Sequence, residues 1–454
     1  MDIGPNTICI RAEQTEADAN WFKYTLSLLS DLIDVSWDGE ETGATLVYGG
    51  AGERETLRIP VAADIGDGAV VLRSFDCDDA GTIDIPIYKS TICPETDEVD
   101  LFFNVFAYAS CLEEYQHEQK SGPIHSYAGR LGWDKRRFDR PYAHYMALAI
   151  RRMIEKRFPY ALSPMNLDAV LVLTHDIDVL RKTLRTRIKE GAFRFYNAVR
   201  NRTFDFGAVA KFVFSTPNYN AIPQISDMER MYGAHGAYNV FVHQKPAQIF
   251  ARLKDAIFNP AYRLHNEPDF VHSLKALAQD GHEIGIHFGF DSWRDCDRME
   301  AELNALKSTL SERDIRSTRQ HWLRFSLSET WKAQSRAGLA VDTTLGFNDR
   351  PGYRAGLAHA FHPYDNNAKC AHDIKVIPTV LMDSQLYYYR NFTPEQRRQF
   401  ISEMLGDLVS VGGMAAIIWH THVFSMDHRW GEDYEYVLEV AQAKGIRFQR
   451  PSDC

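Results

Sequence analysis

The sequence predicts an α/β protein whose second part forms parallel βα units, arranged either as a doubly wound sheet or as a barrel. From residue 168 onwards, short apolar runs alternate with helical segments, which is the pattern of such units. The runs are continuously apolar, as is typical of parallel strands that are buried on both faces. Polar residues suited to catalysis follow several of these runs, at the point where each strand would end.

The first part, residues 1–165, is expected to be a smaller α+β accessory domain. Segment 19–33 predicts a helix because its apolar residues, among them Phe22, Leu26 and Ile33, recur at helical spacing. Gly and Asp turns separate the short apolar segments that follow. These segments predict strands at 45–50, 56–61, 69–73 and 83–88, and then helices at 100–115 and 141–158. A Pro-flanked linker at 158–166 would end this domain.

The second domain is expected to span residues 166–454. Its strands are predicted at 168–178, 238–243, 282–287, 374–382 and 414–420. Its helices are predicted at 267–281, 298–312, 327–338 and 393–412. In doubly wound sheets and in barrels alike, the chemistry collects at the carboxyl ends of the strands. We therefore expect the functional site among the polar residues that follow these strands.

Composition and charge restrict the class of protein. The 454 residues carry a net charge of −10, and residues 1–118 alone carry 24 acidic and 6 basic residues, which argues against nucleic-acid binding as the main activity. The chain begins without a basic and apolar leader and has no run of 18 apolar residues, so we expect a cytoplasmic protein. Its seven cysteines are odd in number and lack a CxxC pair, which predicts reduced thiols.

Two aspartates, Asp176 and Asp178, follow the first apolar run of the second domain. Paired acids that divide their roles, one binding a metal and the other acting as a base, are common in metal-assisted hydrolysis. Solvated loop aspartates are the alternative. His287 ends the run 282–287, as either a structural histidine or a metal ligand. Asp291 follows four residues later, a spacing that one helical turn would bring onto the same face.

Further candidates lie later in the chain. Arg319 and His321 share a six-residue segment with a second arginine, and an arginine beside a carboxylate base would orient it and keep it ionised. A surface ion pair is the alternative for this arginine. Asp342 follows the apolar segment 338–341. His420 and His422 lie on one face of the last predicted strand, and either could act as a general acid.

Segment 179–202 is set apart by its charge, with eight basic residues and one acidic residue. Leu180, Leu184, Ile188, Phe195 and Val199 lie near one face of a helix in this segment. A basic amphipathic helix can rest on an anionic membrane surface. The alternative is a surface helix whose apolar stripe packs on the core and whose basic residues are solvated.

The order of these motifs resembles that of the polysaccharide deacetylase family of metal-dependent carbohydrate esterases. The motifs are Thr-x-Asp-x-Asp at 174–178, Gly-His-Glu-Ile-Gly-x-His at 281–287, Arg-x-x-aromatic at 319–322, Asp-x-Thr at 342–344 and apolar-apolar-Trp-His at 417–420. The resemblance covers about residues 168–445. The first 160 residues look like the extra N-terminal domain that precedes the catalytic domain in one bacterial branch.

The resemblance implies an irregular (β/α)7 barrel that hydrolyses an N-acyl group, usually acetyl, on an amino sugar. The attacking water would be bound to one divalent metal ion, and zinc is the expected ion. Asp176 resembles the family's catalytic base, and Asp178 and His287 resemble its metal ligands. Arg319 resembles the arginine that orients the base. His420 resembles the general acid that protonates the leaving amine, with Asp342 as its orienting partner.

Two departures from the family pattern bear on the metal. Ile177 stands where many members have the aspartate that binds it, which assigns that role to Asp178. Asp291 stands where the family has a second histidine, so the third ligand is either Asp291 or His321. We favour His321 because it lies beside the arginine that faces the pocket. Two further residues that resemble this branch, Arg354 and Asp383, are candidate pocket residues without an assigned role.

Several functions remain open on the sequence alone. The leading hypothesis is a deacetylase-like hydrolase of carbon–nitrogen bonds in an amino-sugar glycan or glycan precursor. One alternative is a catalytically inactive relative that binds glycans, and another is a deformylase of a lipid-linked sugar, which the basic segment would suit. A metallohydrolase that uses His420 and His422 as its metal pair is a further alternative, ranked low because this pair lies on the last strand.

Overall fold

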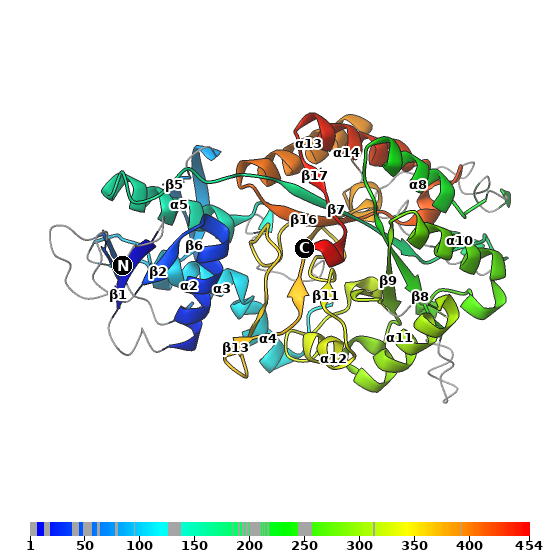
Figure 1. The fold of residues 1–454 in the computed structure, drawn as a ribbon, viewed down its shortest axis with the longest axis horizontal. Helices are drawn as coiled ribbons and strands as arrows, with labels where there is room; N and C mark the ends of the chain where they lie inside the picture. The colour runs from blue at the N-terminus through cyan, green and yellow to red at the C-terminus, as the bar shows by residue number, and fades with distance from the viewer. Residues whose placement is uncertain are drawn as a thin grey trace.

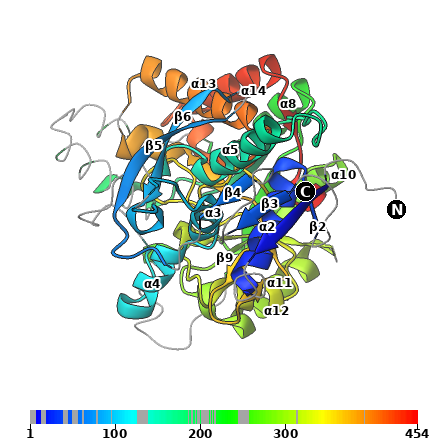
Figure 2. The ribbon, with the colours of Figure 1, turned by 90° about the vertical axis from the view of Figure 1, so that its left-hand side faces the viewer.

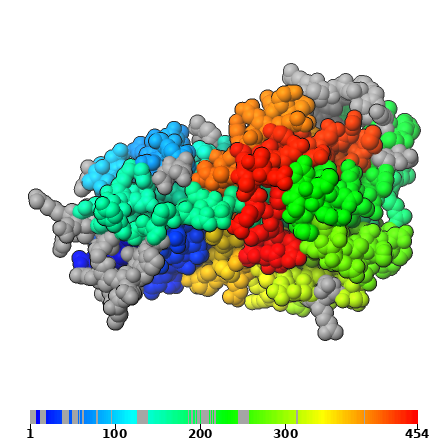
Figure 3. Space-filling view, turned by 45° about the horizontal axis from the view of Figure 1, so that its top comes forward, coloured from blue at the N-terminus to red at the C-terminus, as the bar shows by residue number. Residues whose placement is uncertain are grey.

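The computed structural model describes residues 7–12, 19–38, 45–48, 57–60, 64–77, 80–94, 96–125, 138–184, 218–243, 257–311, 314–390 and 392–454, with scattered positions between 186 and 215. The chain forms two adjoining sections, one before strand β7 and one from β7 onwards (Figure 1). The first section packs against one side of the second (Figure 3).

The first section combines a small sheet, a hairpin and helices. Its sheet has the order β2-β1-β3-β4, and all its pairings are parallel. The strands are β1 (Thr7–Ala12), β2 (Ser36–Asp38), β3 (Thr45–Tyr48) and β4 (Leu57–Ile59), with the antiparallel hairpin β5 (Val70–Asp76) and β6 (Thr82–Tyr88). The helices are α2 (Asn20–Ile33), α3 (Leu101–Ala109), α4 (Leu112–Ser121) and α5 (Tyr142–Arg157). Figure 2 shows α3 and α5 between the hairpin and the small sheet.

The second section contains a curled parallel sheet that forms a partial barrel. Its order is β14-β11-β10-β9-β8-β7-β16-β15, and β17 also pairs with β7. The strands are β7 (Val170–Ile177), β8 (Ala237–Phe241), β9 (Glu283–Phe288), β10 (Ser317–Gln320), β11 (Val341–Asp342), β14 (Lys375–Val376), β15 (Thr379–Met382), β16 (Met414–Ile418) and β17 (Arg447–Phe448). Every residue of β7 is buried, as expected of a continuously apolar parallel strand.

Helices cover the outside of this sheet (Figure 1). They are α8 (Ile222–Met231), α10 (Pro268–Gln279), α11 (Cys296–Leu310), α12 (Thr330–Arg336), α13 (Pro394–Ser410) and α14 (Gly431–Ala443). A short antiparallel pair, β12 (Tyr364–Asp365) and β13 (Cys370–Ala371), lies in the connection before β14. Among the described residues, no helix has the length and apolar character needed to span a bilayer.

One predicted strand is interrupted. Segment 374–382 forms β14 and β15, separated by Ile377 and Pro378, because proline has no N–H to donate to a strand ladder. β14 pairs with β11, and β15 pairs with β16. The two edge strands of the curled sheet are therefore only two residues apart in the chain.

A buried ion pair and buried hydrogen bonds join the two sections. The guanidinium of Arg354 donates to the carboxylate of Glu114 on α4, and both side chains are buried. The carboxylate of Glu118 accepts hydrogen bonds from the hydroxyl of Ser326 and from the backbone N–H of Leu327. Arg354 therefore holds the two sections together, and it does not line the cavities around Asp178.

Segment 179–202 does not pack its apolar stripe on the core. Of the five predicted stripe residues, Leu180 is buried, whereas Leu184, Ile188, Phe195 and Val199 are 73%, 65%, 51% and 50% exposed. The described positions between 184 and 199 are helical. The prediction of an amphipathic helix agrees with this, and the alternative of a core-packed stripe is wrong for these four residues.

Candidate metal centre and catalytic groups

The candidate site lies at the carboxyl ends of neighbouring strands. Asp176 and Asp178 stand at the end of β7, His287 on β9, His321 directly after β10 and His420 shortly after β16. In the sheet, β16, β7, β8, β9 and β10 are consecutive neighbours. Since parallel strands end at the same side of a sheet, residues far apart in the chain meet there.

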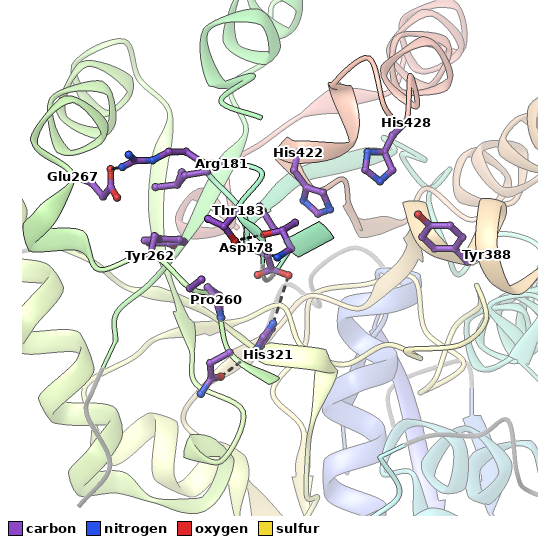
Figure 4. Close-up of a pocket in the computed structure, with 15 residues that line it drawn as sticks. Asp178, Arg181, Thr183, Pro260, Tyr262, Glu267, His321, Tyr388, His422 and His428 are labelled. Carbon is purple, nitrogen blue, oxygen red and sulfur yellow. Dashed lines mark hydrogen bonds and ion pairs between the residues drawn. The ribbon is translucent and has the colours of Figure 1, made fainter. Parts of the chain in front are cut away.

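Asp178, His287 and His321 form a compact cluster of ligand atoms. His287 Nε2 lies 3.3 Å from Asp178 Oδ1, and His321 Nε2 lies 3.5 Å from Asp178 Oδ2. The three ligand atoms all lie within 4.8 Å of one another. Figure 4 shows the side chain of His321 pointing at Asp178. A single divalent ion could bind to all three.

Hydrogen bonds to the Nδ1 atoms of the two histidines orient their imidazole rings towards Asp178. Nδ1 of His287 lies 3.1 Å from the carbonyl oxygen of Arg319, and Nδ1 of His321 lies 3.3 Å from Oδ1 of Asn259. Each Nδ1 therefore carries the proton and donates it, which leaves the Nε2 lone pair facing Asp178. The carbonyl and the amide thus act as partners that orient metal-binding histidines.

Two acceptors in the cluster fit a bound cation. His287 Nε2 and Asp178 Oδ1 are buried and have no hydrogen-bond partner. An unmet pair of buried acceptors is costly unless a cation or a proton lies between them. Burial acts to raise the pKa of Asp178, but His321 and His287 outweigh it and hold that pKa well below its usual range. Two imidazole nitrogens and one carboxylate are a donor set that zinc accepts.

Of the two candidates for the third ligand, His321 lies in the ligand cluster. Asp291 lies outside the cluster, because its carboxylate accepts a hydrogen bond of 2.9 Å from Nη1 of Arg324. Its side chain is 39% exposed. The chain folds into a short helical turn at Ser292–Arg294 directly after Asp291, and the carboxylate ends beside Arg324 instead of beside His287.

Asp176 lies beside the cluster in an environment that keeps it ionised. Arg319 Nε is 3.2 Å from Asp176 Oδ1, as an ion pair without good hydrogen-bond alignment. Asn239 donates a hydrogen bond of 2.9 Å to the same oxygen. Burial acts to raise the pKa of Asp176, but Arg319 and then His287 lower it below its usual range. Asp176 is therefore available as a proton acceptor at neutral pH.

Asn239 is a site residue that the sequence reasoning missed. It stands on β8 directly opposite Asp176 on β7, within an otherwise apolar run. Gly285 makes room for it, because a Cβ at Gly285 would lie 2.4 Å from Asn239 Oδ1. The signal that could have found Asn239 is an amide in a fully buried strand next to the strand that carries Asp176.

His420 is paired with Asp383, and the predicted pairing with Asp342 is wrong. Nδ1 of His420 lies 3.0 Å from Asp383 Oδ2, which also accepts the backbone N–H of His420 at 2.7 Å. Nε2 of His420 faces Asp178, 3.6 Å from its Oδ2. Burial acts to lower the pKa of His420, but Asp383 outweighs it and raises the pKa to about 10. His420 therefore carries a proton that it can donate at neutral pH.

Asp342 has a different set of partners. Its carboxylate accepts hydrogen bonds from Trp331 Nε1 at 3.2 Å and from Gln334 Nε2 at 2.9 Å. The hydroxyl of Thr344 donates at 2.5 Å. Asp342 lies on β11, which β10, β9, β8 and β7 separate from β16 in the sheet. Its hydrogen bonds connect β11 to α12, and it does not reach His420.

Two adjoining cavities open at Asp178. One, of about 160 Å³, is lined by Asp176, Asp178, His287, His321, Trp322, Leu323, Asn348, Met382, Asp383, Ser384, Tyr388, Tyr389, His420, His422, Val423 and Trp430. The other, of about 350 Å³, shares Asp178, His321, Tyr388 and His422 with it and extends towards Arg181, Tyr262 and Glu267 (Figure 4). The smaller cavity is thus lined by Asp176, by His420 and by the three residues of the ligand cluster, between aromatic walls of the kind that line small-molecule sites.

His422 lies in both cavities but outside the ligand cluster. Within the part of the chain that the structure describes, the cluster of Asp178, His287 and His321 contains neither His422 nor His420. The ring centroids of His420 and His422 are 5.6 Å apart. This arrangement does not favour the two histidines as the main metal pair.

Comparison with known proteins adds no assignment. No protein-family model and no curated protein matches the chain. The assignment of a function therefore rests on the geometry of the site.

Proposed function

We propose that this protein is a metal-dependent hydrolase that removes an N-acyl group, acetyl in the first instance, from an amino sugar of a glycan or glycan precursor. One observation carries the proposal. Asp178, His287 and His321 form a three-residue ligand cluster, and an ionised acceptor, Asp176, and a protonated donor, His420, line the same cavity. Hydrolysis of an amide needs this combination, because the attacking water loses a proton and the leaving nitrogen gains one.

The proposed roles follow from the contacts of each side chain. Asp178, His287 and His321 would hold a divalent ion, zinc in the first instance, which lowers the pKa of a bound water and polarises the acyl carbonyl. Asp176 accepts the proton of the attacking water, and Arg319 keeps its carboxylate ionised and oriented. His420 donates a proton to the amine nitrogen as the carbon–nitrogen bond breaks.

The strand arrangement supports a deacetylase-type (β/α)7 barrel as part of this proposal. Counted as a single interrupted strand, β14 and β15 pair with β11 on one side and β16 on the other. On this count, seven strands, β7, β8, β9, β10, β11, β14–β15 and β16, would make up the ring. A closed ring would hold the ligand cluster at the carboxyl end of the barrel.

The test combines metal content with hydrolysis. The purified protein is expected to bind about one zinc per chain and to release acetate from N-acetylated amino sugars, with N-formyl analogues assayed in parallel. Asp176→Asn and His420→Ala should keep the zinc but lose about 10²–10⁴-fold in kcat/KM. Asp291→Asn is the control, because this carboxylate contacts Arg324 and not the cluster.

The outcomes separate hydrolysis from glycan binding. Acetate or formate release that depends on zinc and on Asp176 would support the hydrolase and identify the acyl group. A protein that binds zinc and amino sugars but releases neither acid would instead be an inactive glycan-binding relative.

A further inference from the structure

Segment 180–199 carries an exposed apolar face. Leu184, Ile188, Phe195 and Val199 are each at least half exposed, and the described positions around them are helical. At 3.6 residues per turn these four side chains fall within an arc of about 60° on one side of a helix. A stripe of large apolar side chains left in water is unusual for a surface that has no partner.

The charge of the same segment is strongly positive. Residues 179–202 contain eight basic residues and one acidic residue, in a chain whose overall charge is −10. Two of the basic residues, Arg181 and Lys182, form ion pairs with Glu267 and Asp427. The combination of an apolar stripe with a concentration of positive charge matches an anionic lipid surface. It disfavours a symmetric contact between two copies, since the basic segments would repel each other.

The segment is anchored to Asp427, the residue before His428, which lines the larger cavity. Lys182 Nζ lies 2.5 Å from Asp427 Oδ2, with both side chains almost completely buried. Ser215 donates a hydrogen bond of 2.5 Å to the same carboxylate. Exposed apolar residues flank this anchor on both partner segments, Phe214 at 81% and Met426 at 75% exposure. Phe214 and Met426 therefore add two exposed apolar side chains close to the residues that the anchor joins.

The inner side of the segment lines the larger cavity. Leu180 and Thr186 contribute to its wall, together with Arg181 and Thr183. This cavity reaches Asp178 in the ligand cluster (Figure 4). One short stretch of chain thus faces the site with its inner side and the solvent with its apolar side.

We propose that segment 180–199, with Phe214 and Met426, docks the protein on the surface of an anionic lipid bilayer. The apolar stripe enters the boundary between headgroups and acyl chains, and the basic residues bind the anionic headgroups. Docking in this orientation brings the mouth of the larger cavity close to the membrane surface. Binding to vesicles needs neither metal nor substrate, so its failure would leave the proposed hydrolysis untouched.

Co-sedimentation of the full chain with vesicles tests the proposal. Phosphatidylcholine vesicles with about 30 mol% phosphatidylglycerol should bind the protein at about 0.1 M salt and release most of it at about 0.5 M, whereas pure phosphatidylcholine should bind it weakly. The double variant Leu184→Ser/Ile188→Ser should bind at least about tenfold more weakly, since it removes two inserting side chains. Arg187→Gln should weaken binding about fivefold.

The control is Met231→Ser, which changes a similarly exposed apolar residue on α8, outside the segment, and should bind like the unchanged protein. Circular dichroism establishes that each variant is folded. The proposal is overturned if the unchanged protein does not sediment with the anionic vesicles at low salt. It is equally overturned if the double variant binds these vesicles as tightly as the unchanged protein. It is also overturned if the protein is a dimer that the double variant dissociates, because the apolar face is then an interface between copies.

Discussion

Replacing His321 with alanine is expected to weaken zinc binding by about two to three orders of magnitude, whereas replacing Asp291 is expected to change it less than about twofold. The contrast follows from position. His321 Nε2 lies 3.5 Å from Asp178 within the ligand cluster, and the carboxylate of Asp291 is occupied by Arg324. Both residues are candidates on sequence alone, so the pair of variants tests the geometry directly.

The size of the effect follows from the number of ligands. Zinc sites with four protein ligands bind with about 10–16 kcal/mol, which is roughly 3 kcal/mol for each ligand. A site with three protein ligands that loses one therefore loses about 100-fold to 1,000-fold in affinity. Removing the imidazole also leaves Asn259 without its contact to Nδ1, which adds a smaller penalty.

The assay is competition for zinc with a chromogenic chelator of known affinity at constant pH, with circular dichroism to show that each variant is folded. His287→Ala serves as the positive control, because its Nε2 lies 3.3 Å from Asp178. Equal affinities for the His321→Ala and unchanged proteins would refute the assignment, as would a large loss in Asp291→Ala.

Three further predictions concern protons and packing. Asp383→Asn should lower the pKa of His420 from about 10. The alkaline limb of the pH–rate profile should then shift down by about 1–3 pH units, because the proton donor loses its proton at lower pH. An unchanged limb would exclude His420 as the donor. Zinc affinity should fall as the pH decreases through the pKa of His287, because protons compete with the ion for this imidazole. Burial acts to lower this pKa, but Asp176 and Asp178 raise it above its usual value. Calorimetry at several pH values measures the affinity, and a constant affinity would contradict the prediction. Gly285→Ala should lower the free energy of unfolding by about 1–3 kcal/mol, because the added Cβ would lie 2.4 Å from Asn239 Oδ1 and 2.8 Å from Ser317 Oγ. Chemical denaturation measures this change. A variant as stable as the unchanged protein would show that the neighbouring side chains move away without cost.

Part of the ligand cluster could be predicted from the sequence, because apolar runs locate the ends of strands. Asp178 and His287 each end such a run, and parallel strands end on the same side of a sheet. The sequence predicts no strand before His321, and its place in the cluster is expected only from its position beside Arg319. The pairing of Arg319 with Asp176 is what the family resemblance implies, and the structure places the two 3.2 Å apart.

The partner of His420 could not be predicted in this way, because it depends on which strands are neighbours. β15 lies beside β16, so Asp383, which follows β15, reaches His420, which follows β16. Asp342 also stands at the end of a strand, but β11 does not pair with β16, and Trp331 and Gln334 hold the carboxylate of Asp342. Motif order along the chain carries no information about strand order in the sheet.

Hydrogen-bond partners of the site residues that lie inside a strand or in a loop also could not be predicted from the sequence. Asn239 lies inside an apolar run, and only its register opposite Asp176 shows that it serves the site. Asn259 lies outside the predicted strands and helices, and it reaches His321 through tertiary packing alone. The exposure of Leu184 and Ile188 likewise depends on what else packs nearby, which periodicity does not determine.

The three ligand groups come from β7, from β9 and from the turn after β10, three pieces of chain that only the assembled sheet brings together. An unfolded chain or a short peptide from any one of them cannot reproduce this arrangement, so zinc would bind almost entirely to the native state. Such an ion would link three strands of the sheet. At a free zinc concentration about one hundred times the Kd, it would add about 2.7 kcal/mol to the free energy of unfolding. The melting temperature would then rise with zinc concentration and report occupancy before any substrate is known.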